Sequence, residues 1–153
     1  MKNYFILTLF LFITATVSGQ HENHEYDSTL AAKLGADDLG MKSYVLVILK
    51  TGPSDIQDRE LRDSLFAGHF SNMSRLASEK KLIVSGPFYS NESQYRGLFL
   101  FDVATIEEAT ELVKSDPTVA TGIFETEMYR WYGSAAIPLL LDLYPKLQKS
   151  RAQ

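Results

Sequence analysis

Two short stretches of the chain are apolar at almost every position, and they limit the fold more than any other feature of the sequence. They are YVLVILK, from Tyr44 to Lys50, and RGLFLFDV, from Arg96 to Val103. Successive side chains of a strand point to opposite faces of a sheet, so each stretch predicts a strand that is apolar on both faces. Both sides of the sheet that holds these strands therefore need to be covered.

The segments around these strands predict two helices. The first follows the chain-breaking pair Gly52-Pro53, is capped by Ser54 or Asp55 and extends to about Lys80. Its apolar stripe consists of Leu61, Leu65, His69, Met73 or Asn72, and Leu76. The second helix runs over 106–114, between a capping box and a helix stop that are formed by Thr105 with Glu108 and by Asp116-Pro117.

Two more strands complete the order of elements. KLIVSGP, which ends at Gly86-Pro87, predicts the second strand, and IFETEMYRWYG, from Ile123 to Gly133, predicts the fourth. The order β-α-β-β-α-β is that of a ferredoxin-like α+β sandwich, in which both helices cover one face of a four-stranded sheet. A chain of 153 residues suits one such domain, which we place at residues 44–136.

The other face of this sheet is also apolar and needs a cover of its own. Burying a large apolar side chain contributes about 1.5–3 kcal/mol, so we predict a homodimer that pairs sheet to sheet. The alternative is that the C-terminal tail, residues 137–153, folds back over part of this face. Its leucines at positions 139, 140, 143 and 147 suit a short amphipathic helix.

Residues 1–19 have the layout of a secretory signal peptide, with a lysine at position 2, an apolar run from Tyr4 to about Val17, and small residues before Gln20. The run is shorter than the roughly 20 residues that cross a bilayer, which disfavours the alternative of an uncleaved membrane anchor. Cleavage after Gly19 predicts a periplasmic or secreted protein that has no further contact with the membrane.

Residues 20–43 have scattered charge and no sustained apolar period, which predicts a flexible arm. His21 and His24 are close enough to share a metal ion, but a solvated arm is favoured because no third ligand is nearby. The chain has no cysteine and no nucleotide, phosphate, serine-hydrolase or zincin motif, so we predict no permanent metal and no cofactor. With 15 Lys and Arg against 19 Asp and Glu, no basic block is available to bind nucleic acid.

His69 is the ionisable side chain that most needs an explanation, because it lies in the apolar stripe between Leu65 and Met73. An unsatisfied buried polar group costs about 1–3 kcal/mol, so a buried imidazole requires a hydrogen-bond partner. A backbone carbonyl or a core water is one such partner, and the histidine is then only a satisfied core residue. An ionised side chain is the other, and the histidine then belongs to a functional site.

Several other residues are candidates for that site, and each has a plainer interpretation. Asp116 is explained locally by the turn chemistry of Asp-Pro, and Arg96, a candidate anion contact, is at a strand end where arginines are commonly solvated. Trp131 and Tyr132 suit a pocket mouth, but aromatic pairs are more often part of a core or an interface.

The runs GHFSNMSRLASEKKLIVSGPF and RGLFLFDVATIEEATELVKSDPTVATGIFETEMYRWYGSAA together resemble the YCII-related (YciI-like) family of small α+β proteins. The likeness extends from about residue 44 to about residue 136. Its markers are a histidine in the first helix, a Gly-Pro pair about seventeen residues later, and an Asp-Pro after the second helix with a glycine a few residues on. In this chain the markers are His69, Gly86-Pro87, Asp116-Pro117 and Gly122.

The resemblance implies a dimeric α/β barrel with a site built around a histidine and an aspartate, which by position are His69 and Asp116. One relative, a chloromuconolactone dehalogenase, eliminates chloride from a lactone, and muconolactone isomerase is a cousin of the same fold. Many members have an aspartate shortly after the Gly-Pro pair. Here that region is SNES, in which only Glu92 has a charge.

We therefore expect a small enzyme of the lyase or isomerase type, in which His69 and Asp116 move a proton on a small carbonyl or lactone compound. The predicted substrate-binding residues are Gly86, Pro87, Arg96, Trp131 and Tyr132. The alternative is a non-catalytic dimer that binds a small ligand and uses the histidine only to close a hydrogen-bond network.

Overall fold

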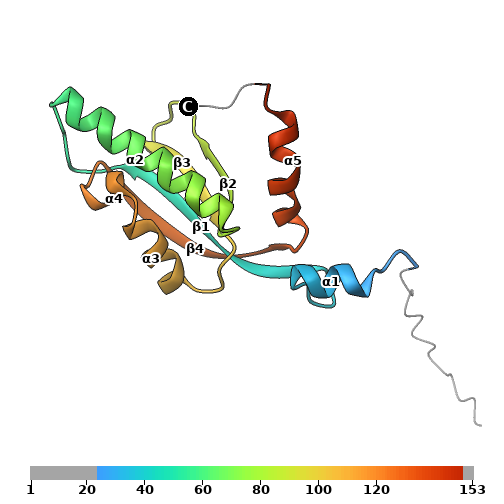
Figure 1. The fold of residues 1–153 in the computed structure, drawn as a ribbon. Coiled ribbons are helices and arrows are strands. Elements are labelled where there is room, and N and C mark those ends of the chain that lie inside the picture. The colour runs from blue at the N-terminus through green and yellow to red at the C-terminus, as the bar shows by residue number, and fades with distance from the viewer. Residues whose placement is uncertain (1–23, 150–153) are drawn as a thin grey trace, which may run out of the picture.

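The computed structural model describes residues 24–149, so the predicted signal peptide, His21 and residues 150–153 lie outside the described part of the chain. The described residues form one four-stranded sheet with helices packed against it (Figure 1). None of the described helices is both long enough and apolar enough to cross a membrane.

The sheet is antiparallel and has the strand order β2-β3-β1-β4. The strands are β1, Met41–Thr51; β2, Leu82–Pro87; β3, Tyr95–Phe101; and β4, Phe124–Ser134. The two strands that are apolar on both faces, β1 and β3, are the central ones, as expected for strands that need cover on both sides. This order confirms the ferredoxin-like α+β prediction.

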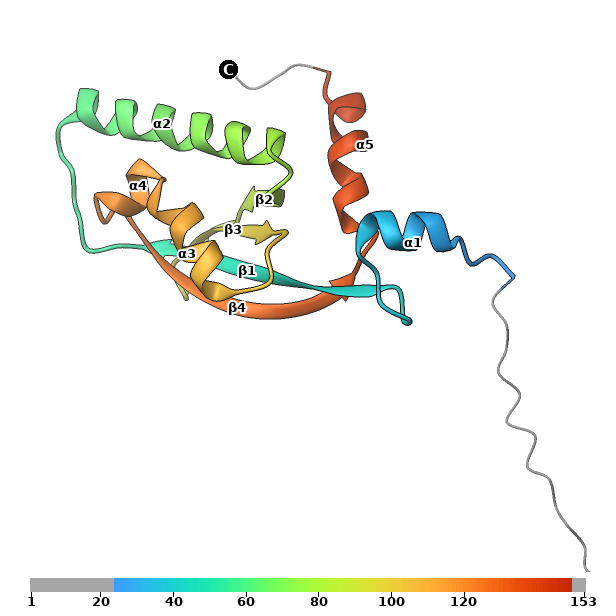
Figure 2. The ribbon, with the colours of Figure 1, turned by 60° about the horizontal axis from the view of Figure 1, so that its bottom comes forward.

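Three helices lie on one side of β1 and β4 (Figure 2), namely α2, Arg59–Ser78; α3, Ile106–Lys114; and α4, Pro117–Ala120. The main core fills the space between these helices and the inward-pointing residues of the strands. Its buried members are Val45, Val47, Leu49, Leu76, Leu82, Phe99, Phe101, Ala109 and Val113.

Helix α2 starts later than the sequence predicts. It begins at Arg59 with Asp58 as its cap, whose side chain accepts a hydrogen bond of 3.0 Å from the Leu61 amide, and not at Ser54 or Asp55. As a consequence Leu61 lies in the first turn and is 49% exposed, so the predicted apolar stripe does not include it. The buried residues of α2 are His69, Asn72 and Leu76.

The loop before α2 is held in a non-helical path by the segment that follows α4. The amides of Gly52 and Ser54 donate to the carbonyls of Ile123 and Gly122 at 2.8 and 3.0 Å. A Cβ on Gly52 would lie 2.2 Å from the Gly122 carbonyl oxygen, so only glycine permits this approach. These two backbone bonds explain why the helix does not extend back to Ser54.

Helix α3, the second of the two predicted helices, is capped by Thr105 as predicted. The side chain of Thr105 accepts from the Glu108 amide at 3.2 Å, and α3 covers the predicted 106–114. Asp116, predicted to be part of a helix stop, is in addition the cap of α4, with Pro117 in its first turn.

The segment that was predicted to be a flexible arm contains defined structure. Helix α1, Ser28–Leu34, is capped by Asp27, and β1 starts at Met41, before the predicted domain boundary. The Tyr132 hydroxyl donates to the carboxylate of Asp37 and so ties this segment to β4. Polar capping and long-range contacts, among them the bond from the Ala135 amide to the Gly40 carbonyl, therefore replace the apolar period that the sequence lacks here.

The face of the sheet opposite α2 has a second apolar cluster of Tyr44, Ile83 and Leu100. The 3-10 turn η1, Ile137–Leu139, and helix α5, Leu140–Leu147, pack Ile137 and Leu141 against it. The tail thus covers part of this face, as the alternative prediction stated. The residues that make this cover, Ile137 and Leu141, are not the predicted leucines. The leucines at 140, 143 and 147 are 47%, 51% and 81% exposed.

Part of this outer face stays uncovered in the described residues. Tyr129 and Trp131 of β4 are 51% and 41% exposed, and their register opposite Leu46 and Tyr44 assigns them to the outer face. The sheet-to-sheet homodimer is untested and stays a prediction, for which this aromatic patch is the natural contact surface.

We expect the purified protein to be a dimer by light scattering, and the double substitution Tyr129→Glu with Trp131→Glu to make it a monomer, because two carboxylates cannot be buried without partners. Leu61→Glu, on the helix side of the domain, is the control and should leave the dimer intact. A monomeric parent protein would contradict the prediction.

Candidate active site

His69 and Asp116 form a buried hydrogen bond between helix α2 and the start of α4. The distance from Nδ1 of His69 to Oδ2 of Asp116 is 2.6 Å. His69 is 6% exposed and Asp116 is fully buried. Of the two partners that the sequence left open for the histidine, the ionised side chain is the one found.

Asp116 is itself fixed by the helix that it caps. Its Oδ1 accepts hydrogen bonds from the amide and the hydroxyl of Thr118, at 2.9 and 2.6 Å, and Thr118 is also fully buried. The hydroxyl lies 3.3 Å from Nδ1 of His69, so it contacts both members of the pair. With Oδ1 occupied twice, only Oδ2 faces the histidine, which fixes the orientation of the carboxylate.

A glycine beside the histidine allows α2 and α4 to approach closely. A Cβ on Gly68 would lie 2.7 Å from Cγ of Pro117. Gly68 precedes His69 in the chain and Pro117 follows Asp116, so this contact is adjacent to the hydrogen bond. A larger residue at position 68 would push the two helices apart and lengthen the bond.

The charge of Asp116 determines which nitrogen of the histidine carries a proton. Burial pushes the pKa of Asp116 up, but the hydrogen bonds from His69 and Thr118 together outweigh it, and its pKa lies below the ordinary value of 3.8. Asp116 is therefore a carboxylate at neutral pH and can only accept hydrogen bonds. Nδ1 of His69 must be the donor, and in the neutral ring Nε2 has the free lone pair.

Nε2 is free to meet a ligand. It makes no hydrogen bond with any residue between 24 and 149. In that part of the chain no buried side-chain nitrogen or oxygen lacks a partner, so Nε2 lies at a surface that solvent reaches. Because the ring as a whole is only 6% exposed, the opening to it is narrow.

Four phenylalanines surround the imidazole ring. The ring centroids of Phe70, Phe124, Phe99 and Phe66 lie 5.3, 5.7, 5.9 and 6.2 Å from that of His69. Phe99 is stacked at an interplanar angle of 28°, and the other three are at 66° or more. The Nε2 atom is therefore in a largely apolar environment.

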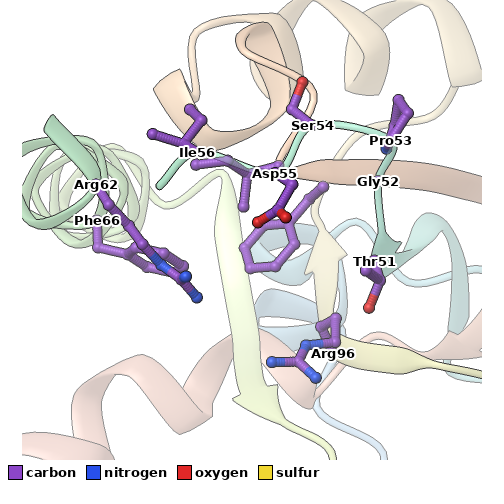
Figure 3. A pocket seen from close by; sticks show the side chains of 11 residues that line it. Thr51, Gly52, Pro53, Ser54, Asp55, Ile56, Arg62, Phe66 and Arg96 are labelled. Atoms are coloured by element: carbon purple, nitrogen blue, oxygen red, sulfur yellow. The ribbon is translucent and has the colours of Figure 1, made fainter. Parts of the chain in front are cut away.

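A cleft of about 240 Å³ lies against this aromatic group. Phe66 and Phe124 line the cleft and also contact His69, so the cleft and the histidine share two walls. The other lining residues come from the end of β1, the loop that follows it, α2, β3 and the residue before β4 (Figure 3). They are Thr51, Gly52, Pro53, Ser54, Asp55, Ile56, Arg62, Arg96 and Ile123.

Of the five residues predicted to bind substrate, Arg96 lines this cleft. Pro87 lines a second, more open hollow that shares Thr51 and Arg96 with the first, and Gly86 lines neither. Arg96 therefore lines the cleft that shares the walls Phe66 and Phe124 with the histidine, and Gly86 does not.

Trp131 and Tyr132 are distant from the cleft, contrary to the prediction that they line a pocket mouth. Trp131 packs on Tyr44 with ring centroids 5.8 Å apart, and Tyr132 bonds Asp37. At about 3.3 Å per residue, Trp131 is roughly 23 Å further along β4 than Phe124, which does line the cleft. Trp131 therefore belongs to the outer face of the sheet, and Tyr132 belongs to the contact with the N-terminal segment.

The region after Gly86-Pro87 does not supply a partner for the histidine. Asn91 bonds the backbone of Tyr89 and Tyr95 in its own loop, and Glu92 makes no hydrogen bond or ion pair with His69. Within residues 24–149, no group of three or more His, Cys, Asp or Glu side chains is placed to hold a metal ion.

The sequence analysis missed four residues that build this site: Gly68, Thr118, Arg62 and Phe66. Two of them had a signal in the sequence. Thr118 follows Asp116 by two positions, the spacing at which a capping aspartate meets the helix amide, and Phe66 precedes His69 by three, on the same helix face. Arg62 shares this helix face with Phe66, but its meeting with Arg96, like the contact of Gly68 with Pro117, depends on segments far away in the chain.

The fold and the site define the class of this protein as a small ferredoxin-like α+β protein with a buried histidine–aspartate pair between two helices. Residues 43–132 match the family model of the YCII-related domain. The chain therefore belongs to the YCII-related family, as the resemblance indicated.

The chain is also similar to two known proteins. The chain is 29% identical over 91 residues to the uncharacterized protein YjpA of Bacillus subtilis, a match that covers 60% of this chain and 95% of that protein. A solved structure of a 5-chloro-2-hydroxyhydroquinone dehydrochlorinase from Burkholderia phenoliruptrix, in complex with 2,5-dihydroxybenzoquinone, is 21% identical, with a TM-score of 0.44. That match covers 57% of this chain and 92% of the other.

The lowered pKa of Asp116 makes the stability of the protein depend on pH. A carboxyl whose pKa is lower in the folded than in the unfolded state stabilises the fold fully above about pH 4, and the contribution is lost as the pH falls through the folded-state pKa. We expect Asp116→Asn, which keeps a capping side chain, to lower the free energy of unfolding by about 1.5–3 kcal/mol at pH 7, the range for hydrogen bonds to charged groups.

Urea unfolding of both proteins between pH 2 and pH 7 measures this difference, which should shrink below about pH 4. The control is Asp58→Asn, which changes a helix cap that has no histidine partner. A difference between Asp116→Asn and the parent protein that does not change with pH would contradict the lowered pKa of Asp116.

Proposed function

We propose that this chain is an exported YCII-related enzyme in which His69 moves a proton on a small carbonyl or lactone compound. The observation that supports it most is the buried hydrogen bond of 2.6 Å from Nδ1 of His69 to Asp116, together with an Nε2 that has no partner in the described chain. A histidine with this arrangement is built to accept a proton at one defined atom.

Each member of the group has a separate role in this mechanism. Nε2 of His69 takes a proton from the carbon next to a carbonyl group. In an isomerisation it returns the proton to another carbon atom. In an elimination it keeps the proton, and the leaving group departs with its electron pair. The carboxylate of Asp116 holds the ring in the required tautomer and stabilises the imidazolium that forms. Thr118 is a positioning residue, because it fixes the carboxylate and does not reach the substrate.

The phenylalanines around the imidazole favour this chemistry. In an apolar environment from which water is largely excluded, the interaction between the imidazolium and the carboxylate is stronger than in water. The same environment holds the carbon skeleton of a small substrate and keeps water from competing for the proton.

The location outside the cytoplasm belongs to the same proposal. Its support is the signal-peptide layout of residues 1–19. N-terminal sequencing of the protein made from the whole chain in a bacterium should find Gln20 at or near the start of the mature form.

One observation supports the alternative of a non-catalytic small-ligand-binding or structural dimer. The imidazole is only 6% exposed, and of the rings beside it Phe99 is buried in the main core and Phe124 packs against that core. In that case the histidine and aspartate only join α2 to α4, and their removal affects stability alone.

Deuterium exchange separates the two functions without knowledge of the natural substrate. The protein is incubated in D₂O with a panel of small ketones, keto acids and lactones, and proton NMR measures the loss of hydrogen next to the carbonyl group. We expect exchange of at least one panel class, and a fall of about 10²-fold or more in His69→Gln, the lower end of what a positioned acid or base contributes.

The control is His24→Gln, which removes an exposed histidine of the N-terminal segment and should not change the exchange rate. His69→Gln keeps an amide donor for Asp116, so the loss in stability should stay near 1–3 kcal/mol. Exchange that persists in folded His69→Gln, or a parent protein that exchanges no panel compound, would reject the enzyme in favour of the ligand-binding dimer.

A further inference from the structure

Two arginines from different elements meet in the cleft beside His69. Arg62 is on α2, and Arg96 is on β3. Their guanidinium groups point into the same space (Figure 3). Because these residues are 34 positions apart in the chain, the fold and not the local sequence brings them together.

A bulge in the sheet lies at Arg96. On β1, Leu49 pairs with Gly97 and the next residue, Lys50, pairs with Tyr95, so Arg96 is an extra residue of β3 without a partner on β1. A bulge of this kind changes the direction of the side chain that it contains. Alternation along an unbroken strand would assign Arg96 to the same face as Leu98, whereas in the structure it lines the cleft with Phe66.

Neither arginine has an anionic partner within residues 24–149. The guanidinium carbon of Arg62 lies 5.9 Å from the ring centre of Phe66, and among the described residues neither arginine side chain makes an ion pair. Asp55 is the one carboxylate among the lining residues, and it forms no ion pair with either arginine. Two positive charges and one negative charge leave the cleft with a net charge of +1.

From these observations we infer that the cleft binds the carboxylate of a small, flat substrate. This inference rests on the proposed function and names the substrate class of the same site. Guanidinium groups bind carboxylates by paired hydrogen bonds, and two that lack partners in a concave space are suited to this contact. The apolar walls formed by Ile56, Phe66, Ile123 and Phe124 hold the rest of the molecule.

The size and charge of the cleft narrow the class further. Its volume of about 240 Å³ is below the roughly 300–1,000 Å³ of sites for drug-sized ligands, so the part of the substrate held in this cleft has about one ring or an equivalent short chain. A net charge of +1 matches one carboxylate better than a phosphate, which has up to two negative charges and would face Asp55.

The same helix sets the distance between the anion contact and the base. Arg62, Phe66 and His69 lie at positions i, i+4 and i+7 of α2, on one face of the helix. Seven residues rise about 10 Å along a helix, which a one-ring carboxylate spans together with the long arginine side chain. The carboxylate at Arg62 and Arg96 would therefore direct the other end of the substrate toward His69.

Asp55 gives the inference an internal test, because its carboxylate points into the space between the arginines (Figure 3). It competes with an incoming anion for the same positive charges. Its removal should therefore strengthen anion binding, whereas removal of either arginine should weaken it.

Benzoate is the probe, and its neutral analogue benzamide is the matched control ligand. Binding is measured by NMR titration of the whole protein, from the shifts of its backbone amide signals. We expect saturable binding of benzoate at the cleft and at least tenfold weaker binding of benzamide. Arg62→Gln and Arg96→Gln should each weaken benzoate at least fivefold, and Asp55→Asn should tighten it.

Arg59→Gln is the control variant, because Arg59 is an exposed arginine of the same helix that does not line the cleft. His69→Gln should bind benzoate as the parent protein does, which separates this inference from the proposed function. Benzoate binding lost in Arg62→Gln and Arg96→Gln but kept in His69→Gln supports the carboxylate site even if no exchange activity exists.

Three results would overturn the inference. The first is a parent protein that does not bind benzoate at the cleft, or binds benzamide equally well. The second is binding that neither arginine variant changes. The third is inorganic phosphate bound more tightly than benzoate with the same dependence on Arg62 and Arg96, which would assign the cleft to phosphate esters.

Discussion

The hydrogen bond between His69 and Asp116 is the interaction on which the site depends. It joins the middle of α2 to Asp116, the cap of α4, and Gly68 allows the contact by leaving room for Pro117. Thr118 occupies the second oxygen of the carboxylate, so the pair has one orientation. The charge on Asp116 in turn fixes the proton on Nδ1, and this leaves Nε2 as the atom available for chemistry.

In the proposed enzyme, the cleft would add to this pair what a lone histidine cannot supply, namely a place to hold a substrate. Phe66 and Phe124 connect the two parts, since each contacts the imidazole and lines the cleft. The loop that carries Asp55 is held in place by the close approach of Gly52 to Gly122. This backbone contact keeps the loop out of helix α2 and also positions it as a wall of the cleft. The local fold therefore shapes the site at which we propose that an anion binds.

Much of the fold could be predicted because its signals are local. The apolar runs of β1 and β3, the cap at Thr105 and the Asp-Pro turn each lie within a few residues, and the position of His69 in the apolar stripe indicated that it needs a partner. Choosing Asp116 required the family resemblance. The roles of Gly68 and Arg62, and the bulge that directs Arg96, depend on contacts between distant segments, so no local pattern reveals them. Trp131 and Tyr132 are at the end of β4, as predicted, but the described cleft lies at the start of that strand, and residue type alone did not indicate this.

The most direct test of this account is the tautomer of His69, measured by ¹⁵N NMR of histidine-labelled protein at a pH where the ring is neutral. The account predicts that Nδ1 has the chemical shift of a protonated nitrogen and Nε2 that of an unprotonated one, because Nδ1 donates to Asp116. A neutral ring with its proton on Nε2 would contradict the account, since the atom proposed to accept the substrate proton would then already be occupied.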